Sequence, residues 1–214
     1  MKIAHISDLH LNTIYSDSNL RQIKQLIKYS LENKADHLVI TGDLTDNASE
    51  KDFEILRNLF RKNGLLNSER LSLVIGNHDI FGGLQSAEEI FIFPERCKKV
   101  NYDAMVNNFV NYFKETFSNC VYKSDETHFP FAKIIDGILI TGINSIARYS
   151  KIKNPFASNG EVSVSQFNEL VQIFQRNQNV RRKLVLIHHY FNKTKVNKQR
   201  STSAIWQNIE KQTM

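Results

Sequence analysis

The tetrapeptide Gly76-Asn77-His78-Asp79 holds the residue types in this chain that are best able to do chemistry. It follows the apolar run Leu71–Ile75, which predicts a buried strand that ends at a turn residue. An amide, an imidazole and a carboxylate in succession contribute little to core packing, whereas they can hold a metal ion and a reacting group. We therefore expect functional chemistry at the end of this strand.

Three other apolar runs also end in polar side chains that can bind metals. Residues 2–7 lead into Asp8 and His10, residues 38–41 into Gly42-Asp43, and residues 184–187 into His188. We expect the chain to bring these four strand ends together around a charged group.

These side chains form a ligand set suited to a transition metal. Asp8 and His10 are two residues apart, so on an extended chain they face the same side and can bind one ion. Asp43 follows a glycine that permits close backbone approach, and its two carboxylate oxygens can bridge two cations. Asn77 adds an amide oxygen and His188 an imidazole nitrogen. Such a mixed set favours zinc, manganese or iron over calcium.

Each fragment taken alone has a simpler interpretation. A single Gly-Asp after a strand is typical of a turn, and a single Asp-x-His is typical of a surface pair. All four fragments occur in this chain, each at the end of an apolar run, and that combination favours a metal site.

The elements that must position these residues alternate in the first part of the chain. We predict strands at residues 2–7, 38–41 and 71–75, separated by amphipathic helices at residues 18–33 and 49–62. This alternation is typical of parallel crossover units, in which functional groups lie at the carboxyl ends of the strands.

The second part of the chain has a different pattern. Two apolar runs, residues 131–135 and 138–143, flank Asp136-Gly137 and predict an antiparallel hairpin. Helices are expected at residues 103–117 and 165–175, and a last strand at residues 184–187. A basic loop at residues 193–200 and a short helix at residues 203–212 follow, whereas residues 81–100 give no clear pattern beyond a loop at their start.

Length and composition predict a single domain that spans residues 1–214. Hydrophobic residues make up 41% of the chain and charged residues 23%, which is ordinary for a soluble globular protein. No apolar run reaches the roughly 20 residues that span a bilayer, and the N-terminus has no signal-peptide pattern. We therefore expect a cytoplasmic protein without a membrane partner, in which Cys97 and Cys120 are ordinary thiols.

The order Asp8-x-His10, Gly42-Asp43, Gly76-Asn77-His78-Asp79 and His188 resembles that of the calcineurin-like metallophosphoesterase family. The segment from Gly160 to Leu170 is similar to the cyclic-nucleotide-phosphodiesterase-like branch. The resemblance implies an α/β fold, a four-layer sandwich of two mixed β-sheets flanked by helices. It also implies hydrolysis of phosphomonoesters or phosphodiesters through a dinuclear metal centre and a bridging hydroxide.

The resemblance also assigns a role to each residue of the motifs. The cofactors would be two divalent ions, Mn, Fe or Zn, with Asp8, His10 and Asp43 on the first and Asp43, Asn77 and His188 on the second. His78 would stabilise or protonate the leaving oxygen of the phosphate-ester substrate, and Asp79 would orient the ring of His78.

The chain departs from the family pattern in its last part. Family members have a late Gly-His-x-His that supplies one histidine to each metal, whereas this sequence has no histidine after His189. We expect either a piece of a longer enzyme without its last strands or a natural variant with a weaker metal site. Each metal would still have three protein ligands, the number in many catalytic zinc sites.

Two alternative functions remain open. Basic residues at positions 176–183 and 193–200 are expected to flank the end of the His188 strand and to attract a polyanion, which favours a nuclease. No aromatic residues alternate with them, as a base-stacking surface would require, so a solvated charged surface is the simpler interpretation of this cluster. The other alternative is a catalytically weak phosphoesterase fold that acts as a binding scaffold, and the sequence does not indicate the oligomeric state.

Overall fold

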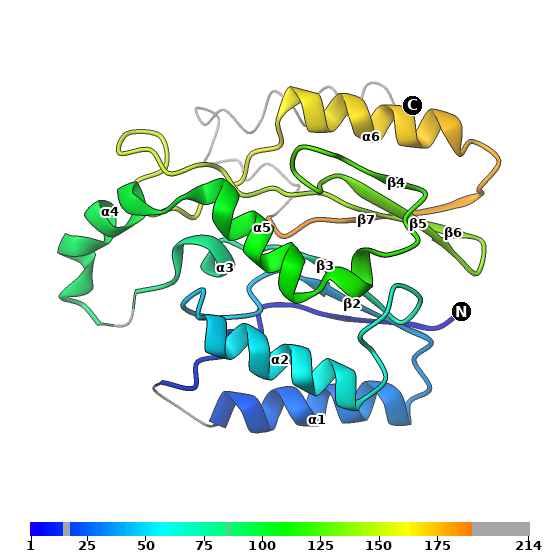
Figure 1. Ribbon diagram of the computed structural model, residues 1–214, viewed down its shortest axis with the longest axis horizontal. Helices are drawn as coiled ribbons and strands as arrows, with labels where there is room; N and C mark the ends of the chain where they lie inside the picture. Colours follow the sequence, from blue (N-terminus) through cyan, green and yellow to red (C-terminus); the bar gives the residue numbers. More distant parts are fainter. Residues whose placement is uncertain (15–17, 85, 190–214) are drawn as a thin grey trace, which may run out of the picture.

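The computed structural model describes residues 1–14, 18–84 and 86–189, and two β-sheets lie at its centre (Figure 1). The helices α1 (Ser18–Glu32) and α2 (Glu50–Lys62) lie below the first sheet in Figure 1, and α6 (Val164–Arg176) lies above the second. The four-layer sandwich of two sheets flanked by helices is therefore confirmed.

The first sheet is parallel and consists of β1 (Ile3–Ile6), β2 (His37–Thr41) and β3 (Leu71–Val74), in that order. Every residue of β2 and β3 is buried, as expected for strands covered by helices on one face and by a second sheet on the other. The crossover helices leave the carboxyl ends of all three strands at the same edge.

The second sheet is mixed and has the order β4 (Tyr122–Lys123), β5 (Phe131–Ile135), β6 (Ile138–Gly142) and β7 (Arg182–Leu186). The predicted hairpin is confirmed, because β5 and β6 pair antiparallel around Asp136-Gly137. β7 pairs parallel with β6, so the chain leaves β7 at the edge where the first sheet also ends.

Most of the region without a clear sequence pattern, residues 81–100, forms the helix α4 (Glu89–Lys99). The single turn α3 (His78–Phe81) starts inside the tetrapeptide before it, and α5 (Tyr102–Tyr112) follows it. α4 escaped prediction because its apolar residues stand next to one another instead of at helical spacing, and because Pro94 lies in its interior.

The helix predicted at residues 103–117 ends early. α5 stops at Tyr112, and the chain continues as the 3₁₀ turn Lys114–Phe117. Such tightening is common at the ends of helices. The predicted loop at residues 193–200 and helix at residues 203–212 lie outside the described residues.

Phenylalanine side chains fill the core between α2 and α5. Phe53, Phe60, Phe109 and Phe113 are fully buried, and the ring centroids of Phe109 and Phe113 are 5.4 Å apart. α2 also has acidic residues in its first turn and basic residues in its last, which complement the helix dipole.

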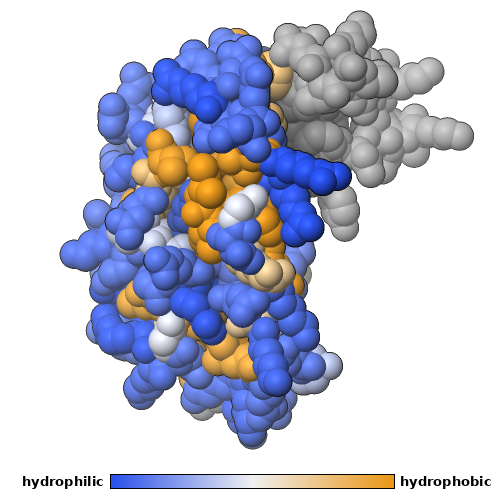
Figure 2. Space-filling model, turned by 90° about the vertical axis from the view of Figure 1, so that its right-hand side faces the viewer, coloured by the Kyte–Doolittle hydropathy of each residue, from blue (hydrophilic) through white to orange (hydrophobic). Residues whose placement is uncertain are grey.

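The end of the molecule opposite the strand carboxyl ends includes the N-terminus and the β5–β6 turn. The amino group of Met1 forms an ion pair of 2.7 Å with Asp136 in that turn. Figure 2 shows an apolar patch on this face, and the apolar residues exposed on β5 and before β4 include Ile134 and Val121. None of the described helices combines the length and apolar character that a bilayer span requires.

Candidate metal centre

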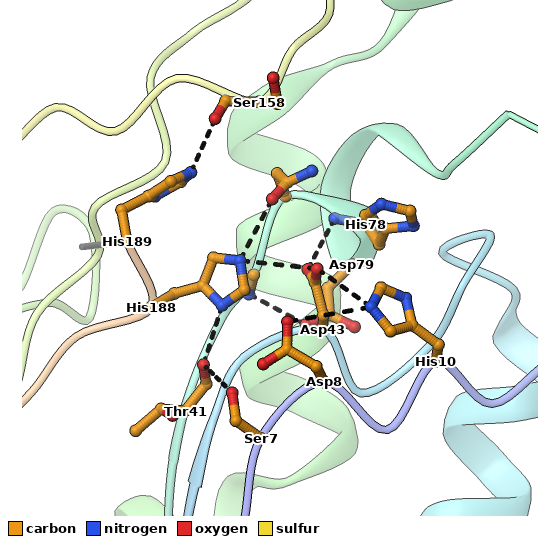
Figure 3. Close-up of polar contacts among 12 residues, drawn as sticks. Ser7, Asp8, His10, Thr41, Asp43, His78, Asp79, Ser158, His188 and His189 are labelled. Atoms are coloured by element: carbon orange, nitrogen blue, oxygen red, sulfur yellow. Dashed lines mark hydrogen bonds and ion pairs between the residues drawn. The ribbon is translucent and has the colours of Figure 1, made fainter. Parts of the chain in front are cut away.

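The carboxyl ends of four strands meet at one edge and bring the predicted ligands together (Figure 3). Asp8 and His10 follow β1, Asp43 follows β2, Asn77 follows β3 and His188 follows β7. β7 belongs to the second sheet, and its position is fixed by packing against the first. Nδ1 of His188 lies 2.8 Å from the carbonyl oxygen of Thr41, the last residue of β2.

Asp43 is the centre of this arrangement. Its Oδ2 atom lies 3.6 Å from Nε2 of His10 and 3.5 Å from Nε2 of His188, and its side chain is only 5% exposed. Its other carboxylate oxygen accepts the backbone N–H of His78 at 2.9 Å. One carboxylate therefore faces ligands from two directions, as a residue that bridges two cations must.

Among the described residues, two groups of side chains have ligand atoms within 4.8 Å of one another. One consists of Asp8, Asp43 and His188, and the other of His10, Asp43 and His78. Asn77 joins the first group, because its Oδ1 lies 3.2 Å from Nε2 of His188. Both groups share Asp43.

The donor atoms are arranged as ligands of a cation. Because a carbonyl oxygen only accepts hydrogen bonds, the contact with Thr41 places the proton of neutral His188 on Nδ1. The lone pair of Nε2 then faces oxygen acceptors of Asp43 and Asn77, at 3.5 Å and 3.2 Å. Tetrahedral bonds of about 2.1 Å separate neighbouring ligand atoms by about 3.4 Å. The residues therefore fit a divalent metal of the zinc or manganese type.

The backbone at three ligands is in a conformation that non-glycine residues rarely adopt. The φ angles of Asp8, His10 and Asp43 are 56°, 44° and 50°, in the left-handed region. Such angles cost of the order of 1 kcal/mol each and persist where the surrounding structure imposes them. Here each one turns a side chain at a strand end inward to the shared site.

Two glycines leave the space that Asp43 and His188 occupy. A Cβ atom on Gly76 would lie 2.1 Å from Oδ1 and 2.2 Å from the backbone nitrogen of Asp43. A Cβ atom on Gly42 would lie 2.5 Å from Nδ1 of His188, and the φ of Gly42 is 91°. Both motifs therefore need glycine at these positions, because Asp43 and His188 lie too close to the backbone for a side chain there.

His78 lies beside the two groups, and its ring is held by a residue that the sequence did not single out. Nδ1 of His78 lies 3.0 Å from Oδ1 and 3.1 Å from the backbone oxygen of Asp46. Gly83 also lies against the ring, since a Cβ there would be 2.4 Å from Cε1 of His78. In the sequence, the one indication that Asp46 could reach His78 was its position three residues after Asp43 in the same turn.

Asp79 contacts other groups in this structure than the His78 ring that the resemblance assigns to it. Its carboxylate is fully buried and accepts backbone N–H groups of Leu44, Thr45 and Gly76 at 2.9–3.2 Å, whereas the His78 ring contacts Asp46. Asp79 therefore ties the loop after β2 to the loop after β3. Burial raises the pKa of Asp79 to about 6, the charge of Asp43 adds to the rise, and the three N–H groups oppose it.

His189 points away from the shared carboxylate. Its Nδ1 lies 3.0 Å from the hydroxyl oxygen of Ser145, and its Nε2 lies 3.1 Å from the carbonyl oxygen of Ser158 (Figure 3). Burial lowers the pKa of His189 to about 4, and the neighbouring His188 contributes to the decrease. His189 thus holds the long loop between β6 and α6 against the site.

The basic residues predicted to flank the His188 strand end lie elsewhere in the described part of the chain. Arg176 ends α6, and the following arginines and lysine up to Lys183 precede or begin β7. They lie at or before the amino end of β7, whereas His188 follows its carboxyl end, and the strand extends about 3.3 Å per residue between them. The part of the cluster at residues 193–200 is outside the described residues.

Comparison with known proteins agrees with this geometry. The sequence profile of the calcineurin-like phosphoesterase family matches residues 1–208. No curated protein matches the chain. Members of this family are metal-dependent hydrolases of phosphate esters, which accounts for a shared carboxylate between two groups of ligands. The chain belongs to the calcineurin-like phosphoesterase family.

Proposed function

We propose that this chain hydrolyses phosphomonoesters or phosphodiesters at a centre of two divalent metal ions. The observation that supports this most directly is the position of Asp43, which lies between His10 and His188 at nearly equal distances. Asp8 and His10 would hold one ion, Asn77 and His188 the other, and Asp43 both.

Each group of this chain has a separate task in the proposed reaction. Bound Mn, Fe or Zn ions would lower the pKa of a bound water and offset the charge on the phosphoryl oxygens. The His78 ring lies beside the ligands, so it can donate a proton or a hydrogen bond to the leaving oxygen. Asp46 holds Nδ1 of that ring, and its negative charge stabilises the protonated imidazole.

The alternative of a nuclease has less support from the described residues. The arginines and lysine up to Lys183 lie at the end of β7 away from the site, so they offer no basic surface beside the reacting groups. The substrate class proposed is therefore a phosphate ester in general.

The test is hydrolysis of bis(p-nitrophenyl) phosphate with and without Mn(II), by the wild type, Asp43→Asn and Asp125→Asn. Asp125 is exposed and lies outside the site, so its variant is the matched control for loss of a carboxylate. We expect Mn(II)-dependent turnover in the wild type and in Asp125→Asn, and none above background in Asp43→Asn. Turnover that persists without metal, or in folded Asp43→Asn, would contradict the proposal.

A further inference from the structure

Helix α4 presents consecutive apolar side chains to solvent. Ile90, Phe91 and Ile92 are 48%, 84% and 60% exposed. Figure 1 places α4 at the left end of the molecule, the end to which the strand carboxyl ends point. Single exposed apolar residues are common on soluble proteins, whereas a contiguous group marks an interaction surface.

The loop between β6 and α6 extends this surface. Ile152 is 91% exposed and stands between Lys151 and Lys153. Arg148, at the start of this loop, forms an ion pair with Asp103, and its guanidinium lies 4.5 Å from the centre of the Tyr102 ring, so the loop lies against the start of α5, directly after α4. In agreement, a hydrogen bond from Lys98 lowers the pKa of Glu95 on α4, and the charge of Lys151 contributes to the decrease. The apolar surface is therefore built from two segments that are far apart in the sequence.

Lysine side chains surround the apolar residues. Lys98 and Lys99 on α4 and Lys151 and Lys153 on the loop are exposed, and the exposed glutamates of the same segments are Glu88 and Glu95. Arg96 and Glu89 form an ion pair of 3.2 Å that adds no net charge. Lys98 also forms an ion pair with Glu95. The other exposed charges near the apolar residues along the chain are Lys99, Lys151 and Lys153 against Glu88, so the surface is apolar with a basic border.

α4 is connected to the catalytic groups through one glycine. Nη2 of Arg96 donates a hydrogen bond to the carbonyl oxygen of Gly83 at 2.6 Å, and the Gly83 N–H donates to the backbone oxygen of Asp46 at 2.7 Å. Gly83 also lies directly against the His78 ring. Arg96 therefore ties α4 to the loop that packs against the His78 ring.

We propose that this α4 surface binds peripherally to an anionic lipid bilayer, which would revise the expectation of no membrane partner drawn from the sequence. The surface is formed by the apolar residues Ile90, Phe91, Ile92 and Ile152 and by the lysines Lys98, Lys99, Lys151 and Lys153. Exposed apolar side chains on a helix at the end of a molecule can enter the boundary between headgroups and acyl chains. The surrounding lysines would then face anionic headgroups, and each lysine would add electrostatic attraction to the bilayer. A second copy of this chain would place lysines against lysines, so charge favours the bilayer.

The test is sedimentation of the full chain with vesicles of phosphatidylcholine, with and without phosphatidylserine. We expect binding to the anionic vesicles that weakens as salt increases. Phe91→Ser should weaken it about tenfold or more, because it removes a side chain of the kind that burial favours most. Lys151→Ala with Lys153→Ala should also weaken it about tenfold or more.

Tyr29→Ser is the matched control, because Tyr29 is an aromatic residue that is 67% exposed on α1, away from this surface. It should bind as the wild type does. Wild type that does not sediment with anionic vesicles, or Phe91→Ser that binds equally well, would overturn the proposal. A dimer that Phe91→Ser converts to monomer, without vesicle binding, would overturn it in favour of a second copy.

If the wild type does not bind vesicles and Phe91→Ser lowers the Tm, the proposal is also overturned. That result would indicate that another part of this chain, which could include residues 190–214, covers the α4 surface. Vesicle binding is measured without substrate, so its outcome is independent of the proposed hydrolysis. The proposal of vesicle binding and the proposal of hydrolysis can therefore be confirmed or contradicted separately.

Discussion

The carboxylate of Asp46 lies 3.0 Å from Nδ1 of His78, and this contact fixes the ring beside the metal ligands. The same Oδ1 atom lies 3.6 Å from Nδ1 of His10. Asp46 thus holds the histidine predicted to act on substrate and lies near one predicted to bind metal. This pair replaces the Asp79–His78 pair that the sequence predicted.

Asp46→Asn should reduce turnover about 10–100-fold, the usual effect of losing a partner behind a catalytic or metal-binding side chain. The amide of asparagine can still accept a hydrogen bond, but it no longer stabilises the charged imidazole of His78. His78→Gln should reduce turnover by about 10²–10⁴-fold, because it removes the proton donor itself. Steady-state kinetics and metal content of the purified variants check both. Loss of metal from His78→Gln would identify His78 as a ligand instead.

Asp79→Asn should reduce stability more than it reduces turnover per folded molecule. The asparagine NH₂ group would face backbone N–H groups that now donate to a carboxylate, and one buried donor left without an acceptor costs about 1–3 kcal/mol. Urea unfolding monitored by circular dichroism measures the loss. An unchanged free energy of unfolding, together with a large loss of turnover, would return Asp79 to a catalytic role.

Two glycine-to-alanine variants should separate metal binding from catalysis. In Gly76→Ala the new Cβ overlaps Asp43, so we expect loss of bound metal. In Gly83→Ala the new Cβ overlaps the His78 ring, so we expect retained metal and reduced turnover.

Metal analysis and kinetics of the two alanine variants are the measurements. Gly64→Ala is the control for destabilisation away from the site, because nothing lies within 4 Å of its added Cβ but its φ of 66° strains the alanine. It should keep both metal and turnover per folded molecule. Equal metal loss in Gly76→Ala and Gly83→Ala would show that the two positions do not act separately.

Lys133 should make stability rise at alkaline pH. Its side chain is 2% exposed between the two sheets, and Nζ donates to the carbonyl oxygen of Leu71 at 2.9 Å. Burial lowers the pKa of Lys133 from 10.5 to about 8. Between these two values the unfolded chain binds a proton that the folded chain does not bind, so the free energy of unfolding increases with pH.

The increase due to Lys133 should reach about 3 kcal/mol by pH 10.5. Urea unfolding of wild type and Lys133→Met across this range measures the contribution of Lys133 together with its coupling to the nearby Cys120 thiol, because groups that do not interact with Lys133 titrate equally in both. Lys123→Met, which removes an exposed lysine on β4, should keep the pH dependence of the wild type. A parallel pH dependence of wild type and Lys133→Met would contradict the prediction.

The sequence by itself determined which residues could form the site and most of the elements that carry them. Asp8, His10, Asp43, Asn77 and His188 each follow an apolar run, and apolar runs, helical spacing and Asp-Gly turns are local properties of the chain. The strands of the first sheet, the hairpin and the helices α1, α2 and α6 were predictable for that reason.

Only the tertiary structure decided which of these residues touch. The parallel pairing of β7 with β6 and its packing on the first sheet bring His188 to Asp43, which is 145 residues earlier in the chain. The left-handed turn at Asp43 directs the chain so that Asp46, and not Asp79, meets His78. Contacts between separate segments depend on how whole elements pack, and no local pattern records that packing.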